Sequence, residues 1–469
     1  MFDRAVAKDS AYDGRFYTAV TTTGIYCLPS CPARKPKAEN TRFFASEAEA
    51  LGAGFRACHR CRPDRFQAGG NTNLELLERL IARVHGAPGS FRTVEDLTSE
   101  SGWGTTRLAE LFREHLHLTP LNFLQRTRLR EAQRLLGATS RSVSDVALEA
   151  GFESPSVFHA QFRKQAALTP GEYRKLAQGD GFVLALPRDF RVEDVLAYHG
   201  RDPQSLCERV EGRTLFKAVG EGVLEIRFEG AKAHCHLHGA SKDGLARMAM
   251  HRCALRMLGL HQDPAAFERS LVRHPAFQTL AMARRGLRVP LTASVWEALV
   301  WAILGQQVNL AFAYTLRRAL VARLGQPRPL GLRSHPGPEA LAAVGLEDLL
   351  ALRLSRAKAE CLLRVAQAVV SGVLDLEAFP DGPATRASAQ LLAIKGIGPW
   401  TAQYVLMRGC GFGDCVPIGD AGLTLALQRH HGLDHRPGPS ETHELLAPFA
   451  PHRSLAVFHL WASLKGVPA

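Results

Sequence analysis

Helical periodicity covers most of the chain, with one stretch of alternating pattern between two helical parts. Over residues 72–178, and again from about Val295 to the end, apolar residues recur at spacings of three and four, which predicts amphipathic helices. Between these parts, "GFVLAL" (181–186), "RTLFKAV", "GVLEIRFEG" and "KAHCHLHGA" alternate like strands, and a long helix is expected over 241–259. The patterns predict a multidomain, mainly α chain with small α+β parts.

Three glycine-rich or proline-bearing stretches interrupt these patterns. They are "QAGGN" (67–71), "AQGDG" (177–181) and "RRGLRVPLT" (284–292). A chain of 469 residues is too long for a single hydrophobic core, so several domains are expected. We predict four domains, over residues 1–68, 72–178, 181–290 and 291–469.

An internal repeat lies within the second predicted domain. "FREHLHLTPLNF" (112–123) returns as "FRKQAALTPGEY" (162–173), and the sequences before both copies also correspond. Each copy predicts a helix, a tight glycine-containing turn and a second helix. A plain helical bundle is the alternative, but the repeated Leu-Thr-Pro favours two helix-turn-helix units.

This repeat resembles the DNA-binding domain of AraC-type transcription factors across its length. The resemblance implies two recognition helices, over 105–112 and 156–164, that enter successive major grooves of double-stranded DNA. Such a regulator also implies RNA polymerase as a partner. The candidate contacts to bases or phosphates are Thr106, Arg107, Ser156 and His159.

Composition and charge fit a soluble DNA-binding protein. The chain is 46% hydrophobic and carries a net charge of +13, which suits a polyanionic partner. No run of eighteen apolar residues predicts a membrane span, and "MFDRAVAKDS" has no signal-peptide pattern. We therefore expect a cytoplasmic, nucleoid-associated monomer with no membrane partner, whose ten cysteines are reduced.

Four cysteines near the start have the spacing of metal ligands. Cys27 and Cys31 are followed, after 26 residues, by Cys58 and Cys61. In a reducing compartment the C-x3-C and C-x2-C pairs predict one Zn2+ held by four thiolates. A domain of this size also needs such a link to be stable. A purely structural zinc site and four unrelated thiols are the alternatives.

"TTTGIYCLPSCPARKPKAENTRFF" and "AGFRACHRCRPD" resemble the amino-terminal domain of Ada adaptive-response regulators. The resemblance implies that a zinc-bound cysteine, here Cys27, accepts the methyl group of a methylphosphotriester in DNA. Zinc would keep that thiol deprotonated and nucleophilic. Methylation reduces the formal charge of the zinc-thiolate group from −2 to −1, which would strengthen DNA binding and so act as a switch.

"LLAIKGIGPWTAQYVLMRG" (391–409) predicts a helix, a Gly-Ile-Gly turn and a second helix, which is a helix-hairpin-helix. Gly396 and Gly398 permit close approach of the backbone to DNA, and the free N–H groups after the turn suit a phosphate. Lys395, on the other side of the hairpin, is expected to face phosphate or solvent. A plain corner between two helices is the alternative.

Asp420 follows this hairpin in "CVPIGDAGLTLAL" (415–427), ahead of an amphipathic helix. The arrangement resembles the helix-hairpin-helix DNA glycosylases, and AlkA-type 3-methyladenine glycosylases most of all, from about residue 181 to the end. The resemblance implies an α+β amino-terminal subdomain, an all-α glycosylase domain and a catalytic Asp420 that stabilises an oxocarbenium-like sugar. A helix cap is the alternative role for Asp420, and the two can coexist.

The resemblance also implies an aromatic pocket for a flipped base, made by Trp400, Tyr404 and Trp461. Bifunctional glycosylase/lyases have a lysine where Trp400 stands, so a monofunctional hydrolase is expected. Gln307 occupies the position of the leucine wedge that AlkA-type enzymes insert into the duplex. A polar wedge still fills the space but buries less apolar surface.

Together these features predict a fused DNA alkylation-repair protein. It would combine methylphosphotriester transfer to Cys27, transcription regulation and hydrolytic excision of alkylated purines of the 3-methyladenine type. A transcription regulator whose last domain binds DNA without catalysis is one alternative. A glycosylase for oxidised or deaminated bases is another, against which the missing lysine and the aromatic residues argue.

Overall fold

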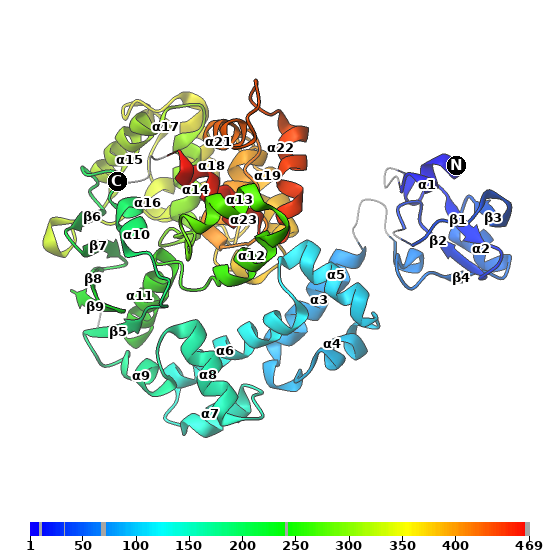
Figure 1. Ribbon diagram of the computed structural model, residues 1–469, viewed down its shortest axis with the longest axis horizontal. Coiled ribbons are helices and arrows are strands. Elements are labelled where there is room, and N and C mark those ends of the chain that lie inside the picture. The colour runs from blue at the N-terminus through cyan, green and yellow to red at the C-terminus, as the bar shows by residue number, and fades with distance from the viewer. Residues whose placement is uncertain (9–11, 32, 67–71, 240–242, 465–469) are drawn as a thin grey trace. The chain divides into compact units, whose positions relative to one another are not determined.

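Two compact units make up the chain, residues 1–128 and residues 129–469. The computed structural model describes residues 1–8, 12–31, 33–66, 72–239 and 243–464. Helices predominate and the two sheets are small, as the ribbon in Figure 1 shows. The expected mainly α, multidomain fold class is thereby confirmed. The break expected at 67–71 lies outside the described residues.

A four-stranded sheet in the order β3-β1-β2-β4 organises the first 66 residues. Its elements are α1 (Phe2–Val6), β1 (Tyr17–Val20), β2 (Ile25–Cys27), β3 (Thr41–Phe44), α2 (Glu47–Gly52) and β4 (Arg56–Ala57). Strands β2 and β4 run parallel, with Tyr26 opposite Ala57. The core around Tyr26 is small and includes three of the four cysteines, so this part depends on its cysteine cluster for stability.

The first helix-turn-helix unit follows in the same compact unit. Its helices are α3 (Thr72–Gly86), α4 (Val94–Ser101), α5 (Thr105–Leu116) and the start of α6 (Pro120–Ala138). The Thr93 side chain and Asp96 form a capping box at the start of α4, and Gly102 ends that helix at a φ of 70°. Phe112 and Phe123 pack edge to face in the core.

The second helix-turn-helix unit repeats this local structure in residues 129–469. Helix α7 covers Val143–Glu149, α8 covers Pro155–Ala166 and α9 covers Pro170–Lys175. The Ser142 and Ser154 side chains cap α7 and α8. Both predicted recognition helices, 105–112 and 156–164, lie within α5 and α8.

A five-stranded antiparallel sheet in the order β5-β9-β8-β7-β6 succeeds these helices. The strands are β5 (Gly181–Ala185), β6 (Glu208–Glu211), β7 (Thr214–Val219), β8 (Gly222–Glu229) and β9 (Lys232–His238). Helices α10 (Val192–His199) and α11 (Gly244–Met257) pack on the sheet, and α11 is the helix expected over 241–259. In β9 the burial alternates between neighbours, as the sequence pattern predicted.

The second helix-turn-helix unit and this sheet share one hydrophobic core. Phe162 and Tyr173 belong to the same buried cluster as Phe182 of β5 and Cys253 of α11. The His251 ring contacts the Tyr173 and Phe182 rings, and its Nε2 lies 2.8 Å from the Ala166 carbonyl oxygen. Figure 1 shows α8 and α9 beside β5 and α11. The expected boundary at 178–181 therefore lies within continuous packing.

We expect Tyr173→Ala to lower the stability of the whole glycosylase part. Truncating a buried aromatic residue in a shared core costs about 3–5 kcal/mol, and this cost should appear in the urea unfolding transition monitored by base-excision activity. Phe123→Ala is the matched control, because Phe123 occupies the same place in the first repeat but packs in a separate core. Equal effects of the two substitutions on that transition would contradict a shared core.

The remainder of the chain is almost entirely helical. Its α-helices are α12 (Pro264–Ser270), α13 (Pro275–Met282), α14 (Val295–Gly305), α15 (Leu310–Leu324), α16 (Pro338–Ala342), α17 (Leu346–Leu350), α18 (Arg356–Val370), α19 (Ala384–Leu392), α20 (Pro399–Val405), α21 (Ala421–His431), α22 (Pro439–Leu446) and α23 (Arg453–Ser463). They surround one large core, which Phe267 of α12 and Phe277 of α13 also join. Packing thus crosses the expected boundary at residue 290 as well. Among the described residues, no helix is long and apolar enough to cross a membrane.

Candidate functional sites

The four predicted zinc ligands come together at the ends of two neighbouring parallel strands. Cys27 ends β2 and Cys58 follows β4, so the parallel pairing of these strands places both cysteine pairs at the same edge. The four sulfur atoms all lie within 4.8 Å of one another. Cys31 and Cys58 have their sulfurs 4.0 Å apart. The backbone N–H groups of Leu28 and Arg60 point at the Cys61 and Cys58 sulfurs, at 3.4 Å.

This cluster fits a tetrahedral zinc ion. Ligand bonds of about 2.3 Å to four sulfurs place neighbouring sulfurs roughly 3.8 Å apart, close to the separations found here. The backbone N–H groups that point at the Cys58 and Cys61 sulfurs favour the thiolate form. Three of the cysteines are buried and Cys27 is half-buried. Cys27 is therefore the most exposed residue of the four.

Lys35 is a charged residue beside the cluster that the sequence pattern did not single out. Its Nζ donates a hydrogen bond to the Pro29 carbonyl oxygen at 2.9 Å. Burial lowers its pKa, whereas the negative charge of Cys31 and Cys27 raises it. A cation in this place can balance part of the charge of the thiolates and attract a DNA phosphate.

The candidate contacts in the helix-turn-helix units lie at the starts of α5 and α8. Thr106, Ser156 and His159 are exposed, as recognition of DNA requires. Arg107 is half-buried, and its guanidinium forms an ion pair with the exposed Glu110 at 3.2 Å. Contact between Arg107 and DNA would require this ion pair to open. Their roles in DNA recognition stay predictions.

The predicted hairpin lies between α19 and α20. Gly396 has a φ of 103°, and a Cβ there would come within 2.9 Å of the Cys361 sulfur, so the turn requires glycine. Gly398 precedes α20, which starts at Pro399. Lys395 is exposed at the turn. Gln306, which the sequence analysis missed, fixes the hairpin by donating hydrogen bonds to the Gly396 carbonyl and the Thr401 hydroxyl, both at 3.0 Å.

Gln307, the expected wedge residue, is exposed in the turn between α14 and α15. Its φ of 53° is left-handed, a conformation that residues other than glycine rarely adopt. Strained backbone of this kind persists where the surrounding structure imposes it, and it concentrates at functional sites. The neighbouring Gln306, anchored to the hairpin, supplies that constraint.

Asp420 stands at the start of α21 and is held by three donors. Its Oδ1 accepts hydrogen bonds from the Leu423 backbone N–H at 2.7 Å and the Trp461 indole at 2.9 Å. Its Oδ2 accepts from the Trp400 indole at 3.1 Å. The carboxylate is thus a helix cap and is also fixed between two indole rings, and its catalytic role stays a prediction.

The three predicted pocket aromatics form one group around this carboxylate. The Trp400 and Tyr404 rings stack with their centroids 5.4 Å apart, and the Tyr404 and Trp461 centroids are 6.5 Å apart. Tyr404 is 7% exposed, whereas the two tryptophans are half-buried. The partly open indoles offer a surface on which a flat base can stack.

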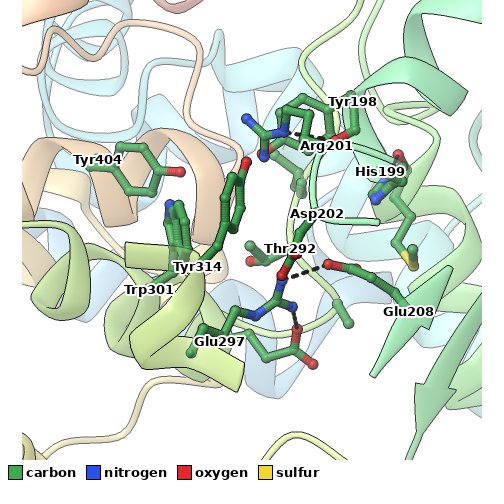
Figure 2. Close-up of a pocket in the computed structure, with 14 residues that line it drawn as sticks. Tyr198, His199, Arg201, Asp202, Glu208, Thr292, Glu297, Trp301, Tyr314 and Tyr404 are labelled. Carbon is green, nitrogen blue, oxygen red and sulfur yellow. Dashed lines mark hydrogen bonds and ion pairs between the residues drawn. The ribbon is translucent and has the colours of Figure 1, made fainter. Parts of the chain in front are cut away.

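A polar pocket adjoins Tyr404, and no sequence pattern indicated it. Figure 2 shows Arg201, Tyr314 and Trp301 around it, beside Tyr198 and Asp202. The Arg201 guanidinium lies 3.6 Å from the centre of the Tyr198 ring, and Arg408 faces the same ring at 4.3 Å. Arg408 lies in a π-helical turn, η8 (Leu406–Cys410), directly after α20. Such turns are frequent at functional sites.

Three family models match this chain in sequence order. "Metal binding domain of Ada" matches residues 1–64, "Helix-turn-helix domain" matches residues 97–176, and "HhH-GPD superfamily base excision DNA repair protein" matches residues 300–451. The folds and sites described above agree with all three. They define the class of the protein as a fusion of an Ada-type metal-binding domain, a helix-turn-helix domain and a base-excision-repair domain.

The chain belongs to the family of the "Probable bifunctional transcriptional activator/DNA repair enzyme AlkA" of Mycobacterium tuberculosis. The two are 32% identical over 481 residues, which is 98% of this chain and 95% of that protein. The "DNA-3-methyladenine glycosylase" of Bacillus subtilis is 33% identical over 61% of this chain and 97% of its own length. "Bifunctional transcriptional activator/DNA repair enzyme Ada" of Escherichia coli is 33% identical over 36% of this chain and 47% of its own length.

A solved structure supports the fold of the second half. The 3-methyladenine DNA-glycosylase from Archaeoglobus fulgidus matches with a TM-score of 0.54 over 61% of this chain and 98% of that protein, at 23% identity. The comparisons confirm the resemblances on which the expected fusion rested.

Proposed function

We propose that this protein repairs alkylated DNA by two chemistries, base excision at Asp420 and methyl transfer to Cys27, and regulates transcription through its helix-turn-helix units. The observation that carries the excision reaction is the Asp420 carboxylate, held by two indole N–H groups inside an aromatic group. The predicted substrates are DNA bases of the 3-methyladenine type. The proposal includes a cytoplasmic, nucleoid-associated monomer that engages RNA polymerase at promoters.

Excision begins when the damaged nucleotide leaves the stack and its base enters the aromatic group. We assign Gln307 to fill the vacated space, because it is exposed and held in a fixed turn. The hairpin at Gly396 and Gly398, with Lys395, binds the phosphate backbone nearby. These contacts place the sugar of the extruded nucleotide next to Asp420.

Cleavage of the glycosidic bond leaves positive charge on the sugar, and Asp420 stabilises that charge. An alkylated purine already carries positive charge, so it departs as a neutral base with the bonding electrons. Water then adds to the sugar carbon, and its proton passes to solvent or to the carboxylate. Trp400 stands where a lyase would have its amine, so no Schiff base forms there and the reaction is hydrolysis.

Methyl transfer is assigned to Cys27 because it is the one ligand of the cluster that is half-buried rather than buried. Zinc, when bound, keeps the sulfur as a thiolate at neutral pH. The Cys27 sulfur attacks the methyl carbon, and the phosphotriester leaves as a phosphodiester anion. Lys35 lies close enough to the cluster for an electrostatic interaction with Cys27, and it is suited to hold the phosphate during the transfer.

Methylation of Cys27 should raise the affinity of the protein for promoter DNA. Forming the thioether removes one negative charge, which reduces the repulsion between the zinc-thiolate group and the DNA phosphates. The gain in affinity should shrink at high salt, because salt screens this repulsion. The measurement is the Kd of methylated and unmethylated protein for one promoter duplex, at low and at high salt. Equal affinities at low salt would disprove the switch.

A transcription regulator without catalysis is the second candidate function, which the exposed recognition helices support by themselves. The two candidates differ in one result. Only an enzyme releases free base from alkylated DNA, and only an enzyme loses that release when the Asp420 charge is removed.

A further inference from the structure

Three hydrogen-bond donors converge in the pocket next to the aromatic group. Figure 2 shows the Tyr314 hydroxyl, the Tyr404 hydroxyl and the Arg201 guanidinium directed toward one another. Tyr314 is only 9% exposed, and its hydroxyl has no hydrogen-bond partner among the described residues. The Tyr404 O–H lines the same pocket and can also donate to a ligand. Buried donors without a partner are costly, so this group is suited to an acceptor from a ligand.

The charge around this group also favours an acceptor over a cation. The carboxylates lining the pocket have cationic partners: Asp202 pairs with Arg318 at 2.6 Å, Glu208 with Arg317 at 2.6 Å and Glu297 with Lys217 at 2.7 Å. Arg201 forms no ion pair with any described residue, and its Nε donates to the Tyr198 carbonyl at 2.7 Å. The unbalanced charge facing the pocket is therefore positive.

One unpartnered acceptor lines the same pocket. Oδ2 of Asp202 is buried and without a hydrogen-bond partner among the described residues, although Oδ1 of the same carboxylate accepts from Arg318. Donors beside an acceptor match a carbonyl oxygen beside a ring N–H, which is the edge of a 6-oxopurine. A 6-aminopurine presents an amino donor toward the Arg201 guanidinium, which has only donors, whereas the tyrosine hydroxyls can donate or accept.

We propose that this pocket binds the carbonyl edge of a flipped purine, and that Arg201 and Tyr314 determine specificity for 6-oxopurines such as hypoxanthine and 7-methylguanine over 3-methyladenine. The inference rests on the proposed glycosylase function. Tyr404 links the two parts of the site, since it stacks on Trp400 and also lines the pocket. A base stacked against the aromatic group thus has its edge within reach of the donors.

The test compares full-length wild type, Arg201→Met and Tyr314→Phe on duplexes that each contain one hypoxanthine, 7-methylguanine or 3-methyladenine. Single-turnover excision of both oxopurines should fall about 10- to 100-fold in Arg201→Met, the usual effect of losing a charged or site-specific hydrogen bond. Excision of 3-methyladenine should stay unchanged or rise. Tyr314→Phe should also lower the ratio of oxopurine excision to 3-methyladenine excision, but by a smaller factor. Arg209→Met is the matched control. Arg209, which lies in β6, also packs over an aromatic ring, that of Phe216, but it does not line the pocket.

Equal losses on all three bases would overturn the assignment, as would unchanged excision of the oxopurines. A wild-type protein that excises 3-methyladenine but neither oxopurine would overturn it too, while leaving the glycosylase proposal intact. Release of no base at all would instead refute the glycosylase proposal. If Arg201→Met does not fold, Tyr314→Phe decides, because it removes only one unpartnered oxygen.

Discussion

Asp420→Asn is expected to slow excision of a neutral base by about a hundredfold or more, the usual cost of losing one preorganised electrostatic group at a reacting centre. The amide keeps the shape of the side chain, and its oxygen can still accept the Leu423 N–H that caps α21. The amide nitrogen cannot accept the Trp400 indole N–H, so a small loss of stability is expected, whereas folding and binding of damaged DNA should be retained. If Asp420 served only as a helix cap, the substitution would cost about 1 kcal/mol of stability and would leave the excision rate almost unchanged.

Hypoxanthine is the informative substrate for this variant, beside an alkylated base. A cationic base such as 3-methyladenine departs readily, so its excision depends less on the carboxylate. Asp263→Asn is the matched control: Asp263 caps α12 through the Ala265 N–H at 3.2 Å, but has no indole partner. Full activity of Asp420→Asn on both substrates would refute the catalytic assignment.

Removing zinc is expected to unfold the first sheet while base excision continues. Structural zinc sites contribute on the order of 10–16 kcal/mol of apparent binding free energy, more than a small core of this kind supplies. Cys31→Ala should therefore abolish zinc binding and the ordered fold of residues 12–66. The cluster and Asp420 lie in different compact units, so excision rates should change little.

Elemental analysis provides the readout for this prediction, with one zinc per chain expected in protein purified without chelator. Cys235→Ala is the matched control, because Cys235 is equally buried but lies in β9, outside the cluster. It should retain the zinc. Wild-type protein without zinc, or a folded and zinc-loaded Cys31→Ala variant, would contradict the proposed site.

Local spacing explains why the cysteine cluster and the hairpin could be predicted from the sequence. Metal ligands, turn glycines and the aspartate before α21 are tied to short segments, so their residue types and intervals carry the signal. Strand alternation also predicted β5, β7, β8 and β9, because one face of each strand is buried, but not the short edge strand β6. The aromatic residues around Asp420 were expected as pocket residues from family resemblance rather than from spacing, and their hydrogen bonds to Asp420 were not predicted.

Long-range packing explains what could not be predicted. Arg201, in the loop after α10, and Arg408, in the turn after α20, face the same Tyr198 ring, and Tyr314 of α15 lines the pocket with Arg201; the intervals between them have no local pattern. The shared core was missed because "AQGDG" (177–181) has the composition of a linker. In the structure it is a tight turn, where the Gly179 N–H donates to Lys175 and the Asp180 carbonyl accepts from Leu237 of β9. Composition predicts a break in a helix, but not whether the two sides pack together.

The most direct test of the account uses one DNA that carries both 3-methyladenine and methylphosphotriesters. The full-length protein is incubated with this DNA, released base is measured by chromatography, and methylation of Cys27 is measured by mass spectrometry of the same sample. The proposed function requires catalytic release of 3-methyladenine together with at most one methyl group per chain, on Cys27. Tight binding of this DNA with neither base release nor methylation of Cys27 would contradict it and would leave a regulator without repair chemistry.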